Sequence, residues 1–365
     1  MQVDYLIVGS GLTGAVIART LADAGRDILV VDRRNHIGGN VHDHSHPSGI
    51  RIHTYGPHYF RTSCDRLWDW VNRFGEFYRY EAEILSDVGD RLVPWPIGYQ
   101  SLKEIAGEKW SPDFIGKPAN LEEAALSLMP KVVYEKFVKE YNEKQWGVKC
   151  KTLDARLCSR FDVRKNNDTR LKPNSKYQGI PVNGYASFMK NMLHSIPVIL
   201  NYDYLLRRHE IRAKKKLIFT GPIDEFFCFS DGRLQYRGQK RHHEYHQDAN
   251  FIQRKGQINN PLHSGGKHIR TLEWKHMMPP CFANRIHGSV ITKEIPFSPS
   301  SPTDYEYPFP NLKNSLLYKK YRSMADSLSS TVIAGRLGEY RYYDMDQAIA
   351  KAMKIAEEML GNKNE

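Results

Sequence analysis

The pattern of apolar and polar residues at the start of the chain predicts a β-α-β unit. An apolar run at 3–8 ends in Gly9, a stretch of helical composition reaches Ala24, and a second apolar run covers 28–31. Short apolar runs bounded by glycine indicate buried strands, and the longer stretch between them indicates a connecting helix. Two further short apolar runs predict two more buried strands: 217–219, which precedes Thr220 and Gly221, and 332–334, which precedes Gly335.

The rest of the chain divides into segments of different periodicity. Apolar residues recur at helical spacing over 121–141, and 345–359 is amphipathic, so both segments predict helices. Polar and apolar positions alternate over 226–296, as expected for antiparallel strands. Segment 161–182 is rich in Asn, Lys and Pro with little apolar periodicity, which predicts a mobile loop.

Together these segments predict an α/β fold in which a Rossmann-like nucleotide-binding domain carries an inserted helical domain and an antiparallel β-sheet domain. The nucleotide-binding domain is expected to be discontinuous and to consist of 1–75, 183–225 and 315–365. The helical domain is expected at 98–160. The sheet domain, which would bind substrate and include the mobile loop, is expected at 76–97, 161–182 and 226–314.

Composition narrows the class of protein. No apolar run is long enough to cross a bilayer, and the first residues lead directly into the glycine turn without the pattern of a signal peptide, so we expect a cytoplasmic protein with no membrane span. The five cysteines are widely spaced and form no Cys-x-x-Cys pair. They predict reduced thiols and no metal site.

The formal net charge of +12 permits either nucleic-acid binding or a substrate that carries phosphates. No helix-turn-helix, zinc-finger or RNA-binding signature accompanies the charge. We therefore expect no nucleic-acid partner.

The first glycine turn has the pattern of a dinucleotide site. The sequence GSGLTG at 9–14 follows the first predicted strand and opens the helix. Glycines in this arrangement allow a tight turn and close approach of the backbone to a pyrophosphate, and the helix N-terminus supplies N–H donors. Asp32 ends the second predicted strand, where its carboxylate can accept hydrogen bonds from ribose hydroxyls. The predicted cofactor-binding residues in this unit are Gly9, Gly11, Leu12, Thr13, Gly14 and Asp32.

The sequence after Asp32 distinguishes between dinucleotides. It continues DRRNHIGGN at 32–40, with Arg33 directly after the acid and Gly39 and Asn40 at the end. This continuation resembles the extended fingerprint of FAD proteins related to amine oxidases. We therefore predict FAD, with Arg33, Gly39 and Asn40 among the residues that bind it.

Four further motifs, taken with this fingerprint, resemble the UDP-galactopyranose mutase family. They are YGPHYFRT at 55–62, YNEKQWG at 141–147, YQGIPVNGY at 177–185 and GRLGEYRYYDM at 335–345. The resemblance runs in the same order from residue 3 to about 355.

The resemblance implies a flavin-dependent mutase that interconverts the pyranose and furanose forms of a nucleotide sugar, in the first instance UDP-galactopyranose and UDP-galactofuranose. In this family the N5 atom of reduced FAD attacks the anomeric carbon and forms a covalent flavin N5–sugar adduct, and no net electron transfer occurs. The resemblance further implies an external reductant such as NAD(P)H, a homodimer as the default assembly, and a role in polysaccharide synthesis such as that of O-antigen.

The resemblance also assigns roles to individual residues. Arg160 and Arg270 would hold the departing diphosphate as catalytic residues. His58 lies in the segment expected near the flavin, where it is either catalytic and cofactor-binding or a structural histidine. Arg336, Tyr343, Asp344 and Met345 precede or begin the last helix and would contact the flavin, with Asp344 as the helix cap.

A second group of residues would bind the substrate. Tyr307 and Tyr342 match tyrosines that contact phosphate, and ordinary core tyrosines are the alternative. Phe137, Tyr141, Trp146 and an asparagine at 259 or 260, here assigned as Asn260, match the pocket of the uracil base. Phe137 and Tyr141 are also four residues apart on a predicted helix, so core packing is the alternative for them, although the unusual run at 141–147 favours the binding role.

The chain departs from the family pattern at three positions, Arg61, Ala82 and Leu171. Arg61 stands where a second histidine is common, and it would either bind the sugar or pair with an acid of the loop. These departures leave UDP-N-acetylgalactosamine and dTDP-fucopyranose open as substrates. An amine oxidase-like flavin oxidoreductase and a non-catalytic polyanion-binding flavoprotein are the alternative classes.

Overall fold

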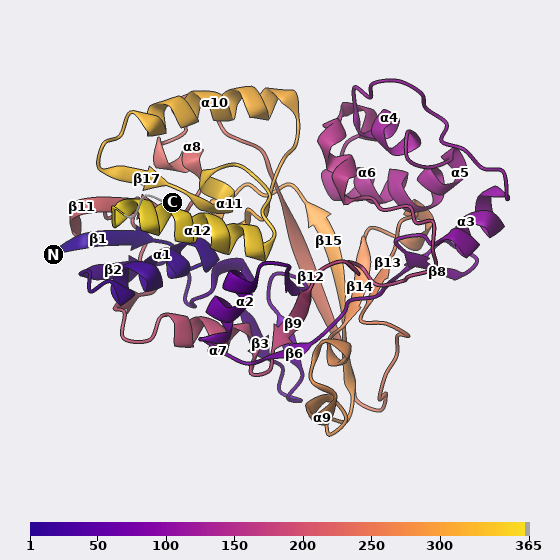
Figure 1. Ribbon diagram of the computed structural model, residues 1–365, viewed down its shortest axis with the longest axis horizontal. Helices are drawn as coiled ribbons and strands as arrows, with labels where there is room; N and C mark the ends of the chain where they lie inside the picture. Colours follow the sequence, from indigo (N-terminus) through magenta and orange to yellow (C-terminus); the bar gives the residue numbers. More distant parts are fainter. Residues whose placement is uncertain (362–365) are drawn as a thin grey trace.

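The computed structural model describes residues 1–361 of the 365-residue chain (Figure 1). Its first layer is a parallel five-stranded sheet in the order β10-β2-β1-β11-β17. The bounds of these strands are Val198–Ile199, Ile28–Val31, Gln2–Val8, Arg212–Phe219 and Thr331–Ile333. The chain thus returns to this sheet from three distant parts of the sequence.

Successive residues of β1 point to opposite faces of this sheet, and each face has its own hydrophobic core. Ile7 packs with helices α1 (Leu12–Asp23), α7 (Gly184–Met192) and α12 (Met345–Met359). Leu6 packs on the other side with α8 (Ile223–Phe226) and α10 (Leu312–Asp326). Because both faces are covered, β2 and the carboxyl-terminal parts of β1 and β11 are continuously apolar rather than alternating.

A seven-stranded sheet forms the middle of the molecule, in the order β16-β12-β15-β14-β13-β7-β8 (Figure 1). Its long strands are β12 (Tyr236–His246) and β15 (Ser289–Phe297). The shorter strands are β16 (Tyr307–Pro308), β14 (Arg270–Glu273), β13 (Gln257–Asn259), β7 (Ile84–Asp87) and β8 (Leu92–Trp95). All neighbours are antiparallel except β13 and β7, which run parallel. The sheet is therefore antiparallel as predicted, with one parallel pair that residue alternation does not reveal.

Short helices form a separate lobe beside the seven-stranded sheet (Figure 1). They are α3 (Tyr99–Ala106), α4 (Leu121–Leu126), α5 (Lys131–Val133), a π-helical segment (Tyr134–Lys139) and α6 (Glu140–Trp146). Two 3-10 turns, Cys150–Thr152 and Ala155–Arg160, complete the lobe. These helices enclose the third hydrophobic core of the chain, which contains Leu121, Phe137 and Trp146.

A small three-stranded sheet corrects the predicted extent of the loop at 161–182. Strand β9 (Tyr177–Pro181) occupies its last part and lies between β5 (Phe60–Thr62) and β6 (Phe77–Arg79). Pairing with two distant strands overrides a local composition that is poor in strand formers. The irregular loop is therefore shorter than predicted, and its mobility stays a prediction.

The predicted fold class is confirmed: a Rossmann-like layer is combined with a helical lobe and an antiparallel sheet. The exact domain boundaries stay a prediction. Within residues 1–361, no helix is long and apolar enough to cross a membrane. In the same part of the chain, all five cysteines are free thiols and no cluster of ligands suited to a metal ion occurs.

The buried carboxylate of Asp43 fastens the small strand β3 (Asp43–Ser45) to helix α7. Its two oxygens accept hydrogen bonds from the backbone N–H groups of Tyr185 and Ala186 at 2.7 and 2.8 Å. These are donors of the first turn of α7, which have no partner within the helix. Gly184 has a φ of +82°, and a Cβ there would lie 2.5 Å from Asp43 Oδ2, so only glycine suits this junction.

We predict that Asp43→Ala lowers the free energy of unfolding by about 2 kcal/mol, because two buried N–H groups lose their acceptor. The midpoint of urea unfolding, followed by tryptophan fluorescence, measures the change. Asp69→Ala, which removes an exposed carboxylate, is the control and should shift the free energy by less than about 0.5 kcal/mol. Equal midpoints for the two variants would contradict the capping role.

Candidate active site

A cavity opens at the carboxyl ends of β1, β2 and β11, which is where nucleotides bind in doubly wound sheets. We call it the dinucleotide cavity. Its lining includes most of the residues predicted to bind the cofactor, namely Gly9, Gly11, Leu12, Thr13, Asp32, Arg33, Gly39, Asn40, His58, Arg336, Tyr343 and Met345. Thr220, Gly221 and Gly335, which follow the two later strands, complete this lining.

The glycines of the first turn have distinct geometric roles. Gly9 has a φ of +106°, and a Cβ on it would lie 2.1 Å from Thr220 Oγ1. Gly14 does not line the cavity, because it packs α1 onto the turn; a Cβ there would lie 1.9 Å from the Gly9 carbonyl oxygen. Helix α1 therefore begins directly at the cavity, and no side chain caps its first N–H groups. Such a helix end suits a pyrophosphate.

Asp32 and Arg33 are both engaged by the protein. The Asp32 carboxylate accepts hydrogen bonds from the Ser10 backbone N–H and hydroxyl at 2.7 and 2.6 Å, and it retains lone pairs for a ligand. The Arg33 guanidinium donates to both oxygens of Glu225 at 2.9 Å each. Asp32 thus suits the predicted ribose contact, whereas Arg33 contributes to the wall of the cavity with its guanidinium turned to Glu225.

A second cavity adjoins the first and shares Asn40, His58, Arg336, Tyr343 and Met345 with it. We call it the adjoining cavity. It brings together further predicted residues, namely Arg61, Leu171, Arg270, Tyr307, Tyr342 and Asp344. Six residues to which sequence reasoning assigned no role also line it, namely Tyr55, Pro57, Tyr59, Ile84, Gln257 and Glu306.

Arg270 begins strand β14, and its side chain is only 16% exposed. Its Nε atom donates to the fully buried Glu294 of β15, which leaves the terminal nitrogens for other partners. Burial lowers the pKa of Arg270, but Glu294 outweighs this effect and holds the pKa above its ordinary value. The adjoining cavity therefore contains a permanent positive charge.

The two predicted phosphate tyrosines lie next to each other at this cavity. The rings of Tyr307 and Tyr342 are 6.4 Å apart and nearly parallel. The Arg160 guanidinium stacks on Tyr342 at 4.0 Å, which places this exposed arginine at the rim. Burial raises the pKa of Tyr307 to about 12, so its hydroxyl keeps its proton and can donate a hydrogen bond.

His58 lies between the two cavities as a neutral imidazole. Burial and the neighbouring Arg336 lower its pKa to about 3. Its Nδ1 atom lies 2.7 Å from the Gly56 carbonyl, which can only accept a hydrogen bond. Nδ1 therefore carries the proton, and Nε2 is an acceptor.

Two of the three departures from the family pattern, Arg61 and Leu171, line the adjoining cavity, and the third, Ala82, contacts Leu171. Arg61 lines the cavity, and its guanidinium also donates to the Asp344 carboxylate at 2.8 Å. Arg61 therefore pairs with an acid as well, but this acid is the N-cap of α12 and does not lie in the loop. The Leu171 N–H donates to the Ala82 carbonyl at 2.7 Å, and this contact holds Leu171 against the cavity. As predicted, Asp344 is the N-cap of α12, and its own N–H donates to Gln347 Oε1 at 3.2 Å.

None of the four residues predicted for the base pocket lines either cavity. Phe137 stacks on Trp95 at 5.3 Å, and Trp146 packs edge-on against Phe309 at 5.7 Å. Both belong to the core of the helical lobe, which agrees with the packing alternative for Phe137. Asn260 donates to the carbonyls of Gly265 and His268 at 2.9 and 3.0 Å and so shapes its own loop.

Tyr141 of helix α6 is absent from both cavity linings as well, but it lies near the charged groups of the site. Burial raises its pKa, and the charges of Arg270, Glu294 and Arg160 also influence this pKa.

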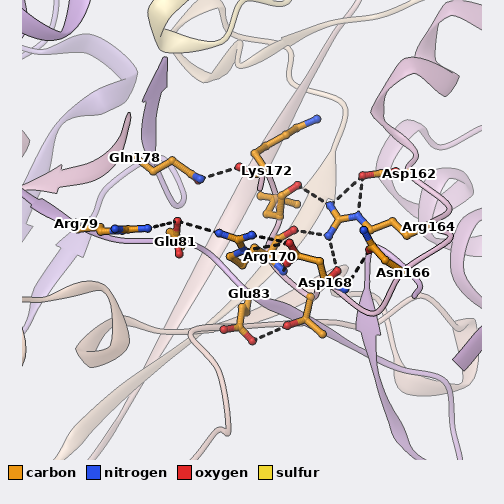
Figure 2. Close-up of polar contacts among 12 residues, drawn as sticks. Arg79, Glu81, Glu83, Asp162, Arg164, Asn166, Asp168, Arg170, Lys172 and Gln178 are labelled. Carbon is orange, nitrogen blue, oxygen red and sulfur yellow. Dashed lines mark hydrogen bonds and ion pairs between the residues drawn. The ribbon is translucent and has the colours of Figure 1, made fainter. Parts of the chain in front are cut away.

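The loop between the lobe and β9 is folded around a buried arginine (Figure 2). Arg164 donates to the backbone carbonyls of Arg170 and Leu171 at 2.7 and 3.2 Å and to the Asp162 carboxylate at 2.9 Å. Arg170 in turn bonds Asp168 and reaches Glu81 at 3.4 Å. Arg164 thus points into the loop, whereas Arg160, at the loop's start, points to the cavity rim.

Sequence reasoning also missed Arg241 and Glu294. Both occupy interior strand positions in segments that were interpreted only as alternating strands. No local pattern marks Glu294 as buried, because it stands directly after Lys293 in ITKEIPF at 291–297.

Comparisons with known proteins agree with this geometry. The family model described as UDP-galactopyranose mutase matches residues 136–342, and that of the NAD(P)-binding Rossmann-like domain matches residues 7–74. The probable UDP-galactopyranose mutase of Klebsiella pneumoniae is 32% identical over 98% of this chain and 95% of its own length. The dTDP-fucopyranose mutase of Escherichia coli is 29% identical over 99% of both chains.

Solved structures support the fold. A reduced UDP-galactopyranose mutase superposes with a TM-score of 0.76 at 15% identity, over 100% of this chain and 96% of its own. A putrescine oxidase superposes with a TM-score of 0.61 at 11% identity, over 99% of both chains. At these identities the likeness concerns the fold alone. The sequence comparisons extend over nearly the whole chain, and they show that it belongs to the UDP-galactopyranose mutase family, a family of isomerases.

Proposed function

We propose that the protein interconverts the pyranose and furanose forms of a nucleotide sugar with the help of reduced FAD. The proposal rests on the observation that two cavities adjoin each other and share lining residues. The dinucleotide cavity opens past His58, Arg336 and Tyr343 into a space that contains a buried, permanently charged arginine and two adjacent tyrosines. A nucleotide sugar in the second space would lie beside the redox ring of a dinucleotide in the first.

FAD fits the dinucleotide cavity by the geometry of the residues that surround it. The glycine turn leaves no room for side chains, the first N–H groups of α1 are uncapped, and Asp32 has acceptor capacity for a ribose. When bound and reduced, FAD would supply a nucleophilic N5 atom that bonds to the anomeric carbon of the sugar without net electron transfer. An external reductant such as NAD(P)H would keep the cofactor reduced.

The side chains of the adjoining cavity would hold the substrate and its leaving group. The terminal nitrogens of Arg270 would bind the diphosphate, and the hydroxyls of Tyr307 and Tyr342 would donate hydrogen bonds to it. Arg160 at the rim would approach the same phosphates from the helical lobe. These donors would stabilise the charge that develops on the diphosphate as the glycosidic bond breaks.

His58 would serve in this scheme as a neutral acceptor. Its Nε2 atom has no proton, so it can accept a hydrogen bond from a bound sugar hydroxyl or from the flavin. It would therefore position ligands and would not donate a proton from an imidazolium.

UDP-galactopyranose is our first choice of substrate because the 32% identical relative is named for it. The 29% identical relative is named for dTDP-fucopyranose, which makes that nucleotide sugar the second choice, and UDP-N-acetylgalactosamine is the third. The departures at Arg61 and Leu171 both line the adjoining cavity and would bear on this selection.

The function is tested by incubating dithionite-reduced protein with a panel of UDP- and dTDP-sugars and separating the products by liquid chromatography. We expect a furanose product from at least one member of the panel, and none from the oxidised protein. Borohydride reduction of the reaction should yield a flavin–sugar species by mass spectrometry. Absence of both signals for every sugar would contradict the proposed function.

We predict that Arg270→Ala lowers turnover by about 100- to 1000-fold, because the diphosphate loses its central charged donor. Flavin content, measured from the ratio of visible to ultraviolet absorbance, should stay near the wild-type value. Arg254→Ala removes an exposed arginine and should leave turnover unchanged. A loss of flavin in proportion to the loss of turnover would assign Arg270 a role in folding or cofactor binding instead.

The low pKa of His58 makes a prediction about pH. Because this pKa is about 3, the imidazole stays neutral throughout the range from pH 5 to 8. The dependence of kcat/KM on pH should therefore have the same shape in His58→Gln and in the wild type, whatever the change in magnitude. An inflection between pH 5 and 8 that disappears in the variant would show that His58 titrates during catalysis.

A further inference from the structure

We infer that Arg241 is a positioning residue that sets the orientation of Arg270 through a buried chain of alternating charges. The inference rests on the proposed function for the identity of the ligand that Arg270 would bind. It concerns a residue that lines neither cavity, and it assigns to that residue a measurable effect on the site.

This row of charged side chains, here called the charge chain, has four members. They come from neighbouring strands of the seven-stranded sheet and from the segment before β16. Arg241 of β12 donates from Nε to Glu294 Oε1 at 2.9 Å, and Glu294 accepts on its other oxygen from Arg270 Nε. The terminal nitrogens of Arg241 donate to both oxygens of Glu306 at 2.9 and 2.8 Å. The order is thus Arg270, Glu294, Arg241, Glu306, and the two end members line the adjoining cavity.

Because the charge chain is buried, its ion pairs depend strongly on its two middle members. The Glu294 side chain is 0% exposed and that of Arg241 is 9% exposed. A buried carboxylate that loses one of two partners is left with an uncompensated charge in a medium of low dielectric. Arg241 is the member whose guanidinium is bound to both glutamates, so its removal disconnects the two ends of the chain.

The turn at Gly56 packs against the charge chain and restricts its side chains. Gly56 has a φ of +90°, and a Cβ there would lie 2.8 Å from Glu294 Oε1 and 3.3 Å from an Nη2 atom of both Arg241 and Arg270. The backbone of the YGPH motif therefore packs directly against the charged groups. With its Nε bound to Glu294 and one Nη beside this turn, Arg270 has little freedom except in the direction of the cavity.

The geometry predicts a change in the titration of Glu294 when Arg241 is removed. In the wild type, burial raises the pKa of Glu294, but Arg270 and Arg241 outweigh burial and hold this pKa below its ordinary value. Without Arg241 the effect of burial persists and only one cation remains, so Glu294 takes up a proton at a higher pH. A protonated Glu294 no longer anchors Arg270 by an ion pair. The titratable and charged groups that face Glu294 are Arg241, Arg270, Tyr59, Tyr141, Tyr307 and His243.

The test compares Arg241→Gln with Arg237→Gln. Arg237 lies four residues earlier on the same strand and is 5% exposed, but it donates to the Gln145 carbonyl and the Ser298 hydroxyl and takes no part in the chain. Arg237→Gln therefore controls for the loss of a buried arginine from β12. Both reduced proteins are assayed for furanose formation from pH 5 to 8.5, with flavin content measured in parallel.

We expect Arg241→Gln to lower kcat/KM by about 100-fold, the effect of misplacing a reacting group by about 1 Å. Its kcat/KM should also fall further as the pH is lowered from 7 to 5, and this acid limb should be absent from the wild type and from Arg237→Gln. Arg241→Lys, which keeps a cation beside Glu294, should suppress the acid limb and recover part of the activity. Identical pH profiles for Arg241→Gln and Arg237→Gln would overturn the inference.

A binding measurement separates this inference from the proposed function. Titration of the oxidised proteins with UDP, followed by calorimetry over the same pH range, reports on Arg270 without any need for turnover. If the wild type forms no furanose product, the proposed function fails, but weaker UDP binding at low pH that is specific to Arg241→Gln would still support the positioning role. Should Arg241→Gln not fold, Arg241→Lys must show weakened UDP binding relative to Arg237→Gln; equal affinities would overturn the inference.

Discussion

The ion pair between Arg270 and the fully buried Glu294 is the constraint on which the active site depends. A carboxylate with no exposed surface requires cationic partners, and it obtains them from two different strands. This requirement holds β12, β14 and β15 in register at the point where the sheet meets the dinucleotide-binding layer. It also turns the free nitrogens of Arg270 towards the cavity, so the same interaction stabilises the sheet and prepares the site for an anion.

The two cavities meet where glycines of two segments allow close contacts with neighbouring groups. Gly9 and Gly14 bring helix α1 onto the first strand, and Gly56 brings the segment of His58 onto the buried charges. Side chains at these positions would displace backbone or charged atoms and would separate the cavities. A reaction between the ring of a bound dinucleotide and a sugar would need this proximity. The residues that would surround the ring and those that would bind the phosphates belong to different layers of the fold.

Much of the fold could be predicted from the sequence because local patterns decide it. The first β-α-β unit, the later strands β11 and β17 and helix α12 follow apolar periodicity and glycine turns, and α12 spans 345–359 as predicted. Strand β9 could not be predicted, because two distant strands stabilise it rather than its own composition. The parallel pairing of β13 with β7 is likewise a property of tertiary contacts.

The candidate site could be predicted in part for the same reasons. Residues on the glycine turns and at the start of α12 lie at the cavities, because their positions follow from the ends of predicted elements. Phe137 and Trp146 lie in the core of the helical lobe, since aromatic residues at helical spacing serve packing as readily as binding. Arg241 and Glu294 escaped prediction because their importance arises from burial and pairing across strands, which a single sequence does not display.

The most direct measurement of the central claim is a crystal structure of the dithionite-reduced protein soaked with a nucleotide sugar that it converts. The account predicts FAD against the glycine turn at the start of α1, the diphosphate on the terminal nitrogens of Arg270 beside Tyr307 and Tyr342, and the anomeric carbon facing the flavin N5 atom next to His58. A diphosphate bound away from Arg270, or a sugar whose anomeric carbon lies out of reach of the flavin, would contradict it.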